Sequence, residues 1–209
     1  MKLVGLSGAQ GAGKSTLLKA LMGNGWTLDQ FRVSRAVQAQ LGWDTLDNVM
    51  ESPETMMEFQ EEVFRQKYKH DYALRDLPTA RTMDAKGHVM LTERTFADID
   101  AYTTQWVWRF VDQGRMTTFG GMHWLSQFHR KCVNAQLDCY TGTLMLPFMA
   151  HVAWEDDPNR AAKNDVTAIY EHIERYMDSA TFLRHPKLVI TTKSVEDRMK
   201  QTEHFLESI

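Results

Sequence analysis

Eight consecutive residues, GAQGAGKS from Gly8 to Ser15, match the pattern G-x-x-x-x-G-K-S/T of a phosphate-binding loop. An apolar segment at 2–7 precedes them and predicts a buried strand, and the segment 16–22 predicts a helix. Between a strand and a helix start, the loop's backbone N–H groups and the positive end of the helix face an anion. Lys14 would reach the β- and γ-phosphates of a nucleotide, and the Ser15 hydroxyl would ligate Mg²⁺.

The motif therefore predicts binding of a nucleoside triphosphate, with ATP and Mg²⁺ as the expected cofactors. Glycine at Gly8, Gly11 and Gly13 would let the backbone wrap closely around the phosphates, where a Cβ would clash. The residues predicted to contact the cofactor are Gly8, Ala9, Gln10, Gly11, Ala12, Gly13, Lys14, Ser15 and Thr16.

A second group of reactive side chains follows the apolar segment 87–92, which predicts another core strand. Glu93 and Arg94 come directly after it. Phosphoryl transfer needs an acid near Mg²⁺ and a cation near the phosphoryl group that moves. Glu93 suits the metal shell, and Arg94 suits a phosphate because its planar guanidinium binds two oxygens at once.

Further segments predict the elements that must position these residues. Strands are expected at 141–148 and 187–191, with a short fifth at 30–34, and helices at 54–74, at 166–176 and from Ser194 onward, where Asp197 completes a capping-box-like pair. Strands that alternate with helices predict an α/β fold, here a five-stranded parallel sheet with helices on both faces. Active-site residues should then lie at the carboxyl ends of the strands. At 209 residues the chain is expected to form a single domain, 1–209.

The composition excludes some functions and sets a background for others. A net charge of −3 does not indicate a broad basic surface that binds nucleic acid electrostatically. No signal segment or membrane-spanning apolar run is present, so we expect a cytoplasmic protein with no membrane partner. Cys132 and Cys139 are too few for a disulfide framework and are expected to be buried thiols.

Glu93-Arg94-Thr95 after an apolar strand resembles the Glu-Arg-Ser segment of deoxyribonucleoside kinases and the Asp-Arg segment of thymidylate kinases. The chain is also similar to the P-loop kinases that include nicotinamide riboside kinases and phage nucleotide kinases. In that group an Asp and an Ala-Tyr follow the acid–Arg pair, as Asp98 and Ala101-Tyr102 do here. The resemblance implies a P-loop NTPase kinase fold, an ATP-dependent phosphotransferase, a catalytic role for Asp98 and, in many members, a homodimer.

The resemblance also assigns a lid near 154–165, whose Arg160 would close over the phosphoryl group, with Lys163 as second choice. On the acceptor side, Phe59-Gln60 matches a Phe-Gln pair whose amide reads a base edge. Deoxyribonucleoside kinases carry a Glu near residue 35 as the base toward a hydroxyl, whereas this chain has Arg35, with Asp29 upstream.

An arginine at that place suits the phosphate of a nucleoside monophosphate, which needs no strong base. We therefore favour a (deoxy)nucleoside monophosphate as acceptor; a hydroxyl acceptor would need a base such as Asp29, Asp98 or Asp100. An alternative is a phage kinase that phosphorylates 5-hydroxymethyluracil within DNA, with the Trp- and Arg-containing segment 106–124 facing the DNA. A nucleotide-driven switch without a small acceptor is the third reading, and the acid–Arg pair argues against it.

Overall fold

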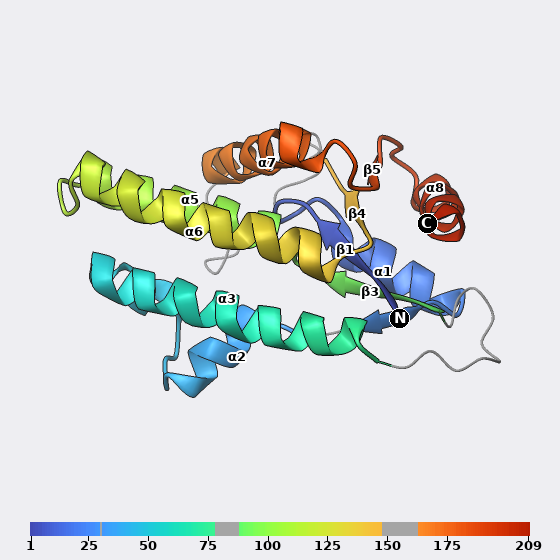
Figure 1. Ribbon diagram of the computed structural model, residues 1–209, viewed down its shortest axis with the longest axis horizontal. Coiled ribbons are helices and arrows are strands. Elements are labelled where there is room, and N and C mark those ends of the chain that lie inside the picture. Colours follow the sequence, from blue (N-terminus) through green and yellow to red (C-terminus); the bar gives the residue numbers. More distant parts are fainter. Residues whose placement is uncertain (30, 78–87, 148–162) are drawn as a thin grey trace.

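In the computed structural model, a five-stranded parallel sheet forms the centre of the molecule (Figure 1). The structure describes all residues except 30, 78–87 and 148–162. The strand order is β2-β3-β1-β4-β5. The strands are β1 (Lys2–Ser7), β2 (Thr27–Asp29), β3 (Val89–Glu93), β4 (Gly142–Met145) and β5 (Lys187–Val189). The predicted α/β class and the five-stranded parallel sheet are confirmed.

Helices cover both faces of the sheet, because side chains of the strands alternate between two apolar clusters. In β1, Leu3 joins one cluster, whereas Val4 and Leu6 join the other. The Leu3 side carries α2 (Val33–Gln40), α3 (Pro53–Arg75), α5 (Phe96–Asp112), α6 (Thr118–Cys139) and α7 (Lys163–Asp178). The opposite face carries α1 (Lys14–Gly23) and α8 (Val195–Ser208). Two 3-10 turns, η1 (Leu46–Met50) and η2 (Ala180–Phe182), complete the described elements.

The helices α3, α5 and α6 are the longest described, and they run side by side past the edge of the sheet (Figure 1). Local sequence explains where α3 begins. Ser52 accepts a hydrogen bond from the backbone N–H of Thr55 at 3.0 Å, and Pro53 occupies the first helical turn, where it is tolerated. The predicted cap of α8 is also confirmed, since Ser194 accepts from the N–H of Asp197 at 3.0 Å.

The strand predicted at 30–34 is wrong. The second strand is β2 (Thr27–Asp29), and α2 begins at Val33. The alternation of Phe31 and Val33 looks like a strand, but Val33 and Val37 are four residues apart and bury one face of a helix. As a result Arg35 lies in the first turn of α2 with an exposed side chain, and Asp29 takes the place at the strand end.

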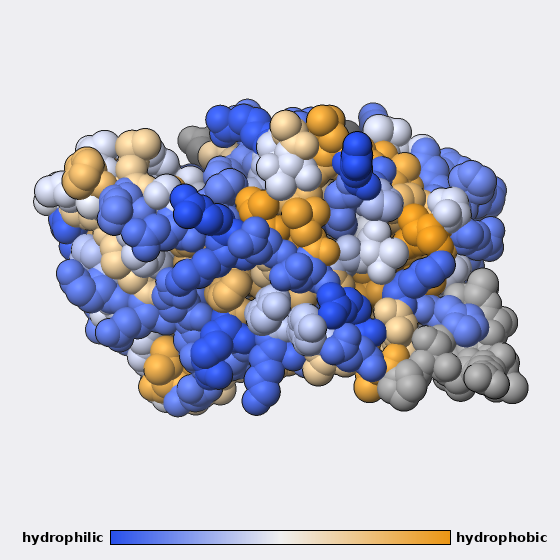
Figure 2. Space-filling model, in the orientation of Figure 1, coloured by the Kyte–Doolittle hydropathy of each residue, from blue (hydrophilic) through white to orange (hydrophobic). Residues whose placement is uncertain are grey.

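The face seen in Figure 2 is mainly hydrophilic, with apolar groups gathered near its middle. Among the described helices, none is both long enough and apolar enough to cross a membrane. Both cysteines are buried and free, as the sequence predicts.

Gly5 in β1 fixes how closely α5 approaches the sheet. A Cβ at this position would lie 2.5 Å from Cγ2 of buried Thr95. We expect Gly5→Ala to lower the free energy of unfolding by about 1–3 kcal/mol, as overpacking does. Adding Thr95→Ser, which removes that methyl group and keeps the hydroxyl, should restore most of the loss in urea denaturation.

Gly23→Ala is the matched control, because a Cβ there has no heavy atom within 4 Å. It should leave the protein unchanged or stabilise it by up to about 1 kcal/mol. If Gly5→Ala is as stable as Gly23→Ala, the close approach is not a constraint on the fold.

Candidate active site

The predicted phosphate-binding loop joins β1 to α1. Gly11 and Gly13 adopt positive φ values of 82° and 86°, and Gly13 forms the N-cap of α1 without a side-chain hydrogen bond. The first N–H groups of a helix have no intrahelical partner. With no side chain to cap them, they are left to bind an anion, and the helix dipole favours negative charge at the same place.

Lys14 lies under this loop and is almost fully buried, with 5% of its surface exposed. Its ammonium group donates hydrogen bonds to the carbonyl oxygens of Gly8 and, at 3.0 Å, Ala9. Burial lowers the pKa of Lys14 to about 8, although the nearby Asp98 carboxylate opposes the shift. The lysine is thus held in the loop with its charge poorly solvated. Phosphate oxygens would reduce the free-energy cost of burying that charge.

Asp98 contacts the start of the loop and is completely buried. Its Oδ1 accepts from the N–H of Gly8 at 3.1 Å, and its Oδ2 accepts from the N–H of Thr95 at 2.9 Å and from the Thr95 hydroxyl at 3.0 Å. The second oxygen caps α5, and the first holds the start of the phosphate loop. These contacts are to backbone and to Thr95, so the geometry is that of a positioning residue, and a catalytic role for Asp98 stays a prediction.

Glu93 and Arg94 lie at the carboxyl end of β3, beside the phosphate loop. Arg94 is the one non-glycine residue with positive φ (64°) in the described part of the chain, and its N–H donates to the carbonyl of Leu6 at 3.1 Å. Its guanidinium lies 4.7 Å from the ring centre of Tyr102, whose hydroxyl accepts from the N–H of Gln10 at 3.3 Å. Burial opposes the charge of Arg94, but Tyr102 and Asp98 outweigh it and raise its pKa further. The turn after β3 therefore carries a permanent cation next to the loop.

Two residues near the phosphate loop, Ser15 and Glu93, fit Mg²⁺ by their chemistry. Ser15 is exposed at the start of α1, and Glu93 is half-buried at the end of β3. A hydroxyl and a carboxylate are hard oxygen ligands of the kind that Mg²⁺ prefers. Both come from elements that the contact between Arg94 and Leu6 brings to one edge of the sheet.

A buried polar network that was not predicted from the sequence lies between α3 and the end of β3. Lys67 donates to the hydroxyl of Thr92 at 2.8 Å and to the carbonyl of Glu93 at 3.2 Å, and its ammonium is 3.0 Å from Oδ1 of Asp71. Both Lys67 and Asp71 are fully buried, and burial raises the pKa of Asp71. The phenol of Tyr140 donates to the other oxygen of Asp71.

This network ties α3 to the end of β3, and a sequence signal for it exists. The inward stripe of α3 runs through Met56, Phe59 and Val63 and then continues with the polar residues Lys67 and Asp71. Polar residues in the position of core residues must have partners.

Asp29 ends β2 beside this network. Its carboxylate accepts from the Thr92 hydroxyl at 2.9 Å and lies 3.0 Å from Nε2 of His70. Gln60 lies on the same stripe of α3, two turns before Lys67, and is 3% exposed. Asp29 thus contacts this network through Thr92, Gln60 lies two turns from Lys67 along α3, and Arg35 is exposed on α2.

Arg198 of α8 is a second residue that the sequence did not single out. It is 8% exposed, donates to the carbonyl of Thr192 at 2.9 Å and to that of Ala12 at 3.3 Å. A Cβ on Gly13 would come within 2.8 Å of its guanidinium. Arg198 therefore packs against the back of the phosphate loop and links it to the segment after β5.

The remaining predictions differ in outcome. Most of the candidate lid, including Arg160, lies outside the described residues. The last residues of the lid, from Lys163 on, belong to α7. In the segment 106–124, Trp106 and Trp124 pack against the core, and Trp124 stacks on Phe128 at 5.0 Å. Trp108 is the most exposed of the three tryptophans, with 38% of its surface accessible.

One hollow, with a volume of about 580 Å³, lies elsewhere and is lined by residues of α3 and by Lys131 of α6. Its lining includes Glu58, Glu61 and Glu62, and the last two pair with Lys131 and Arg65 of the same lining. No residue of the phosphate loop lines it, so this hollow is separate from the loop at the end of β1.

Neither the known protein-family models nor the curated proteins match this chain. Solved structures do match, and two kinases are among them. One is the deoxyadenosine kinase from M. mycoides, solved with dCMP and dCDP bound: 13% identity, a TM-score of 0.64, and 99% of this chain on 100% of that chain. The other is the thymidylate kinase from Candida albicans: 13% identity, a TM-score of 0.66, and 99% of this chain on 91% of that chain. The chain has the fold of the P-loop nucleoside and nucleotide kinases.

The lowered pKa of Lys14 predicts a pH-dependent affinity for nucleotide. Phosphates favour the protonated lysine, so the dissociation constant of a non-hydrolysable ATP analogue should rise as the pH increases through 8. Calorimetric titrations from pH 7 to 9.5 would measure it.

Lys14→Ala is the control, because it removes the titrating group and keeps the rest of the site. It should bind more weakly and with little pH dependence across this window. An equally steep profile in the variant would assign the effect to another group.

Proposed function

We propose that the protein is an ATP-dependent phosphotransferase that acts on a nucleotide or nucleoside, with a (deoxy)nucleoside monophosphate as the preferred acceptor. One observation carries the proposal. The glycine-rich loop with Lys14 and the pair Glu93-Arg94 meet at one sheet edge, joined by the bond from Arg94 to Leu6 and by Asp98. A phosphate-binding loop alone would serve a switch as well, whereas an added acid and a fixed cation suit transfer of a phosphoryl group.

The roles follow from the positions of the side chains. The start of α1 and Lys14 hold the triphosphate, and Arg94 neutralises charge on the phosphoryl group as it moves. Ser15 and Glu93 would hold Mg²⁺, which would neutralise negative charge on the phosphates. Arg160 is proposed to close over the same group from the lid.

On the other side of the phosphoryl group, Gln60 is proposed to read the base. Its buried amide offers both a donor and an acceptor, which is what a base edge requires. Arg35 is proposed to bind the phosphate of a monophosphate, which requires the long side chain to reach inward from the exposed face of α2. If the acceptor is a hydroxyl, Asp29 at the end of β2 is the base.

The test is to incubate the protein with γ-labelled ATP and three acceptor pools: nucleosides, nucleoside monophosphates, and duplex DNA with and without 5-hydroxymethyluracil. Label in a nucleoside diphosphate supports the proposal in its preferred form, and label in a monophosphate supports the nucleoside acceptor. Label that appears in modified DNA alone would favour the alternative function, a kinase that phosphorylates DNA. ATP binding with no transfer of label to any pool would favour the nucleotide-driven switch.

Glu93→Gln removes the charge of the proposed metal partner and keeps its shape. We expect the rate of transfer to fall by about 10²-fold or more, as for loss of an electrostatic group in an active site. The Mg²⁺ concentration for half-maximal activity should rise as well. An unchanged Mg²⁺ titration would move the role to another acid.

Arg35→Ala and Asp29→Asn separate the two acceptor chemistries. A charge-assisted hydrogen bond is worth about 1.5–3 kcal/mol, so Arg35→Ala should raise the KM for a monophosphate about ten- to a hundredfold and leave that for ATP unchanged. Asp29→Asn should lower kcat strongly, by about 10²-fold or more, only if the acceptor is a hydroxyl.

Arg65→Ala is the matched control, because Arg65 is an exposed arginine of α3 that pairs with Glu62 on the same helix. It should leave both KM values at the wild-type level. An equal rise of the acceptor KM in Arg35→Ala and Arg65→Ala would exclude a specific role for Arg35.

A further inference from the structure

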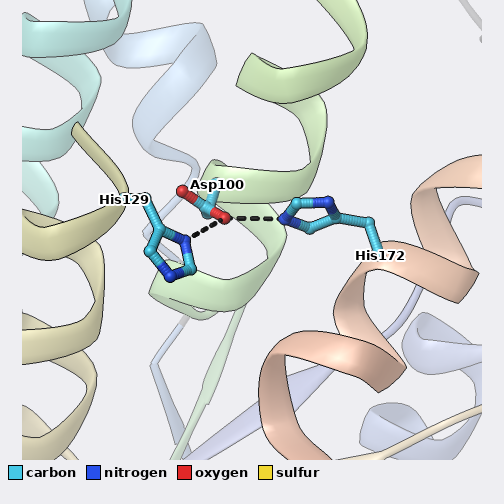
Figure 3. A group of neighbouring side chains, drawn as sticks. All are labelled: Asp100, His129 and His172. Atoms are coloured by element: carbon cyan, nitrogen blue, oxygen red, sulfur yellow. Dashed lines mark hydrogen bonds and ion pairs between the residues drawn. The ribbon is translucent and has the colours of Figure 1, made fainter. Parts of the chain in front are cut away.

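Three side chains of the metal-binding type meet on the helical side of the molecule, each from a different helix. Asp100 lies on α5, His129 on α6 and His172 on α7, and both imidazoles point at one carboxylate oxygen (Figure 3). His129 Nδ1 is 3.0 Å from Oδ2 of Asp100, and His172 Nε2 is 2.7 Å from the same atom. One ligand atom from each residue lies within 4.8 Å of the other two.

The carboxylate is deeply buried and incompletely satisfied. The side chain of Asp100 is 1% exposed, and its Oδ1 is a buried oxygen without a hydrogen-bond partner in the described structure. A buried carboxylate is costly unless a cation or several donors stabilise it. The two histidines contact Oδ2 only, so Oδ1 is left without a partner among the described residues.

We propose that Asp100, His129 and His172 bind a divalent first-row transition metal ion, with Zn²⁺ as the representative. Zn²⁺ binds imidazole nitrogen and carboxylate oxygen at about 2.0–2.2 Å, which places ligand atoms of a tetrahedral site roughly 3.3 Å apart. The observed separations of 3.0 and 2.7 Å need to open by only a few tenths of an ångström.

Binding requires lone pairs on the two nitrogens that now donate. In the neutral imidazoles the hydrogen moves to the other ring nitrogen, and a histidinium instead releases a proton to solvent. The side chain of His129 is 47% exposed, so water can reach the fourth metal position. Three protein ligands and one open position are typical of such a site.

The site is separate from the phosphate loop. Successive residues of a helix are about 100° apart, so Asp98 and Asp100 face nearly opposite directions. Asp98 contacts Gly8, whereas Asp100 faces α6 and α7. The metal would fasten α7 to α5 and α6, about two helical turns from the ion pair between Arg109 and Asp165 that already joins α5 to α7.

A second group with metal-ligand side chains, Asp29, His70 and Asp71, is a poorer candidate. The ammonium of Lys67 lies 3.0 Å from Asp71 and already neutralises it, and a metal ion would have to displace or repel that charge. We therefore expect one transition-metal ion per chain, at the Asp100 site.

The experiment titrates the chelator-treated, nucleotide-free full chain with ZnCl₂ in excess Mg²⁺, by calorimetry and by thermal unfolding. One Zn²⁺ should bind, Tm should rise, and Co²⁺ in its place should give the visible absorption of a low-symmetry site with nitrogen ligands. His172→Gln and Asp100→Asn should each weaken Zn²⁺ at least tenfold, since loss of a ligand costs no less than loss of its supporting hydrogen bond.

Two controls make the result specific. His123→Gln changes an exposed histidine of α6 outside the cluster, and His70→Gln removes a ligand of the second group. Both should bind Zn²⁺ like the wild type. No stoichiometric uptake, equal affinity in His172→Gln, or a loss confined to His70→Gln would each overturn the proposal. His172 is partly exposed, so its variant tests the site even where Asp100→Asn does not fold.

Discussion

The buried carboxylate of Asp98 is the contact on which the rest of the site depends. It accepts hydrogen bonds from Gly8 at the start of the phosphate loop and from Thr95 at the start of α5. A fully buried charge must be fully hydrogen-bonded, so these donors cannot move apart without a large cost. The two parts of the candidate active site, the loop after β1 and the turn after β3, are therefore held in one geometry by this side chain and by the backbone bond from Arg94 to Leu6.

Several other features follow from that constraint. Arg94 adopts a left-handed backbone conformation that costs about 1–3 kcal/mol in a non-glycine residue and persists only where its surroundings enforce it. Its N–H is bonded to Leu6, and its guanidinium lies over Tyr102, which in turn contacts the loop at Gln10. The cation is thus positioned before any substrate binds, and preorganised charge of this kind is what electrostatic catalysis requires.

A second buried charge system joins α3 to the sheet. Lys67 and Asp71 anchor the middle of α3 to the end of β3, and this fixes Gln60 two turns away on the same helix face. The phosphate loop and α3 therefore rest on separate buried networks that meet at β3.

The sequence by itself determined the phosphate loop and most of the sheet. Eight contiguous residues between a strand and a helix define a local structure, so their positions are fixed by neighbours in the chain. The prediction of a strand at 30–34 is wrong because the apolar pattern of this segment fits a strand as well as the start of a helix. The pairing of Thr27 with Met90 shows that the strand is at 27–29 instead.

Only the tertiary structure decided which distant residues meet. Lys67 and Thr92 are 25 residues apart, and Asp100 and His172 are 72 apart. No spacing rule connects such pairs, because the contact depends on how whole helices pack against the sheet and against one another. The chemistry of the phosphate loop could therefore be predicted from the sequence alone, whereas the network of Lys67 and the three-helix cluster of Asp100 could be found only from the fold.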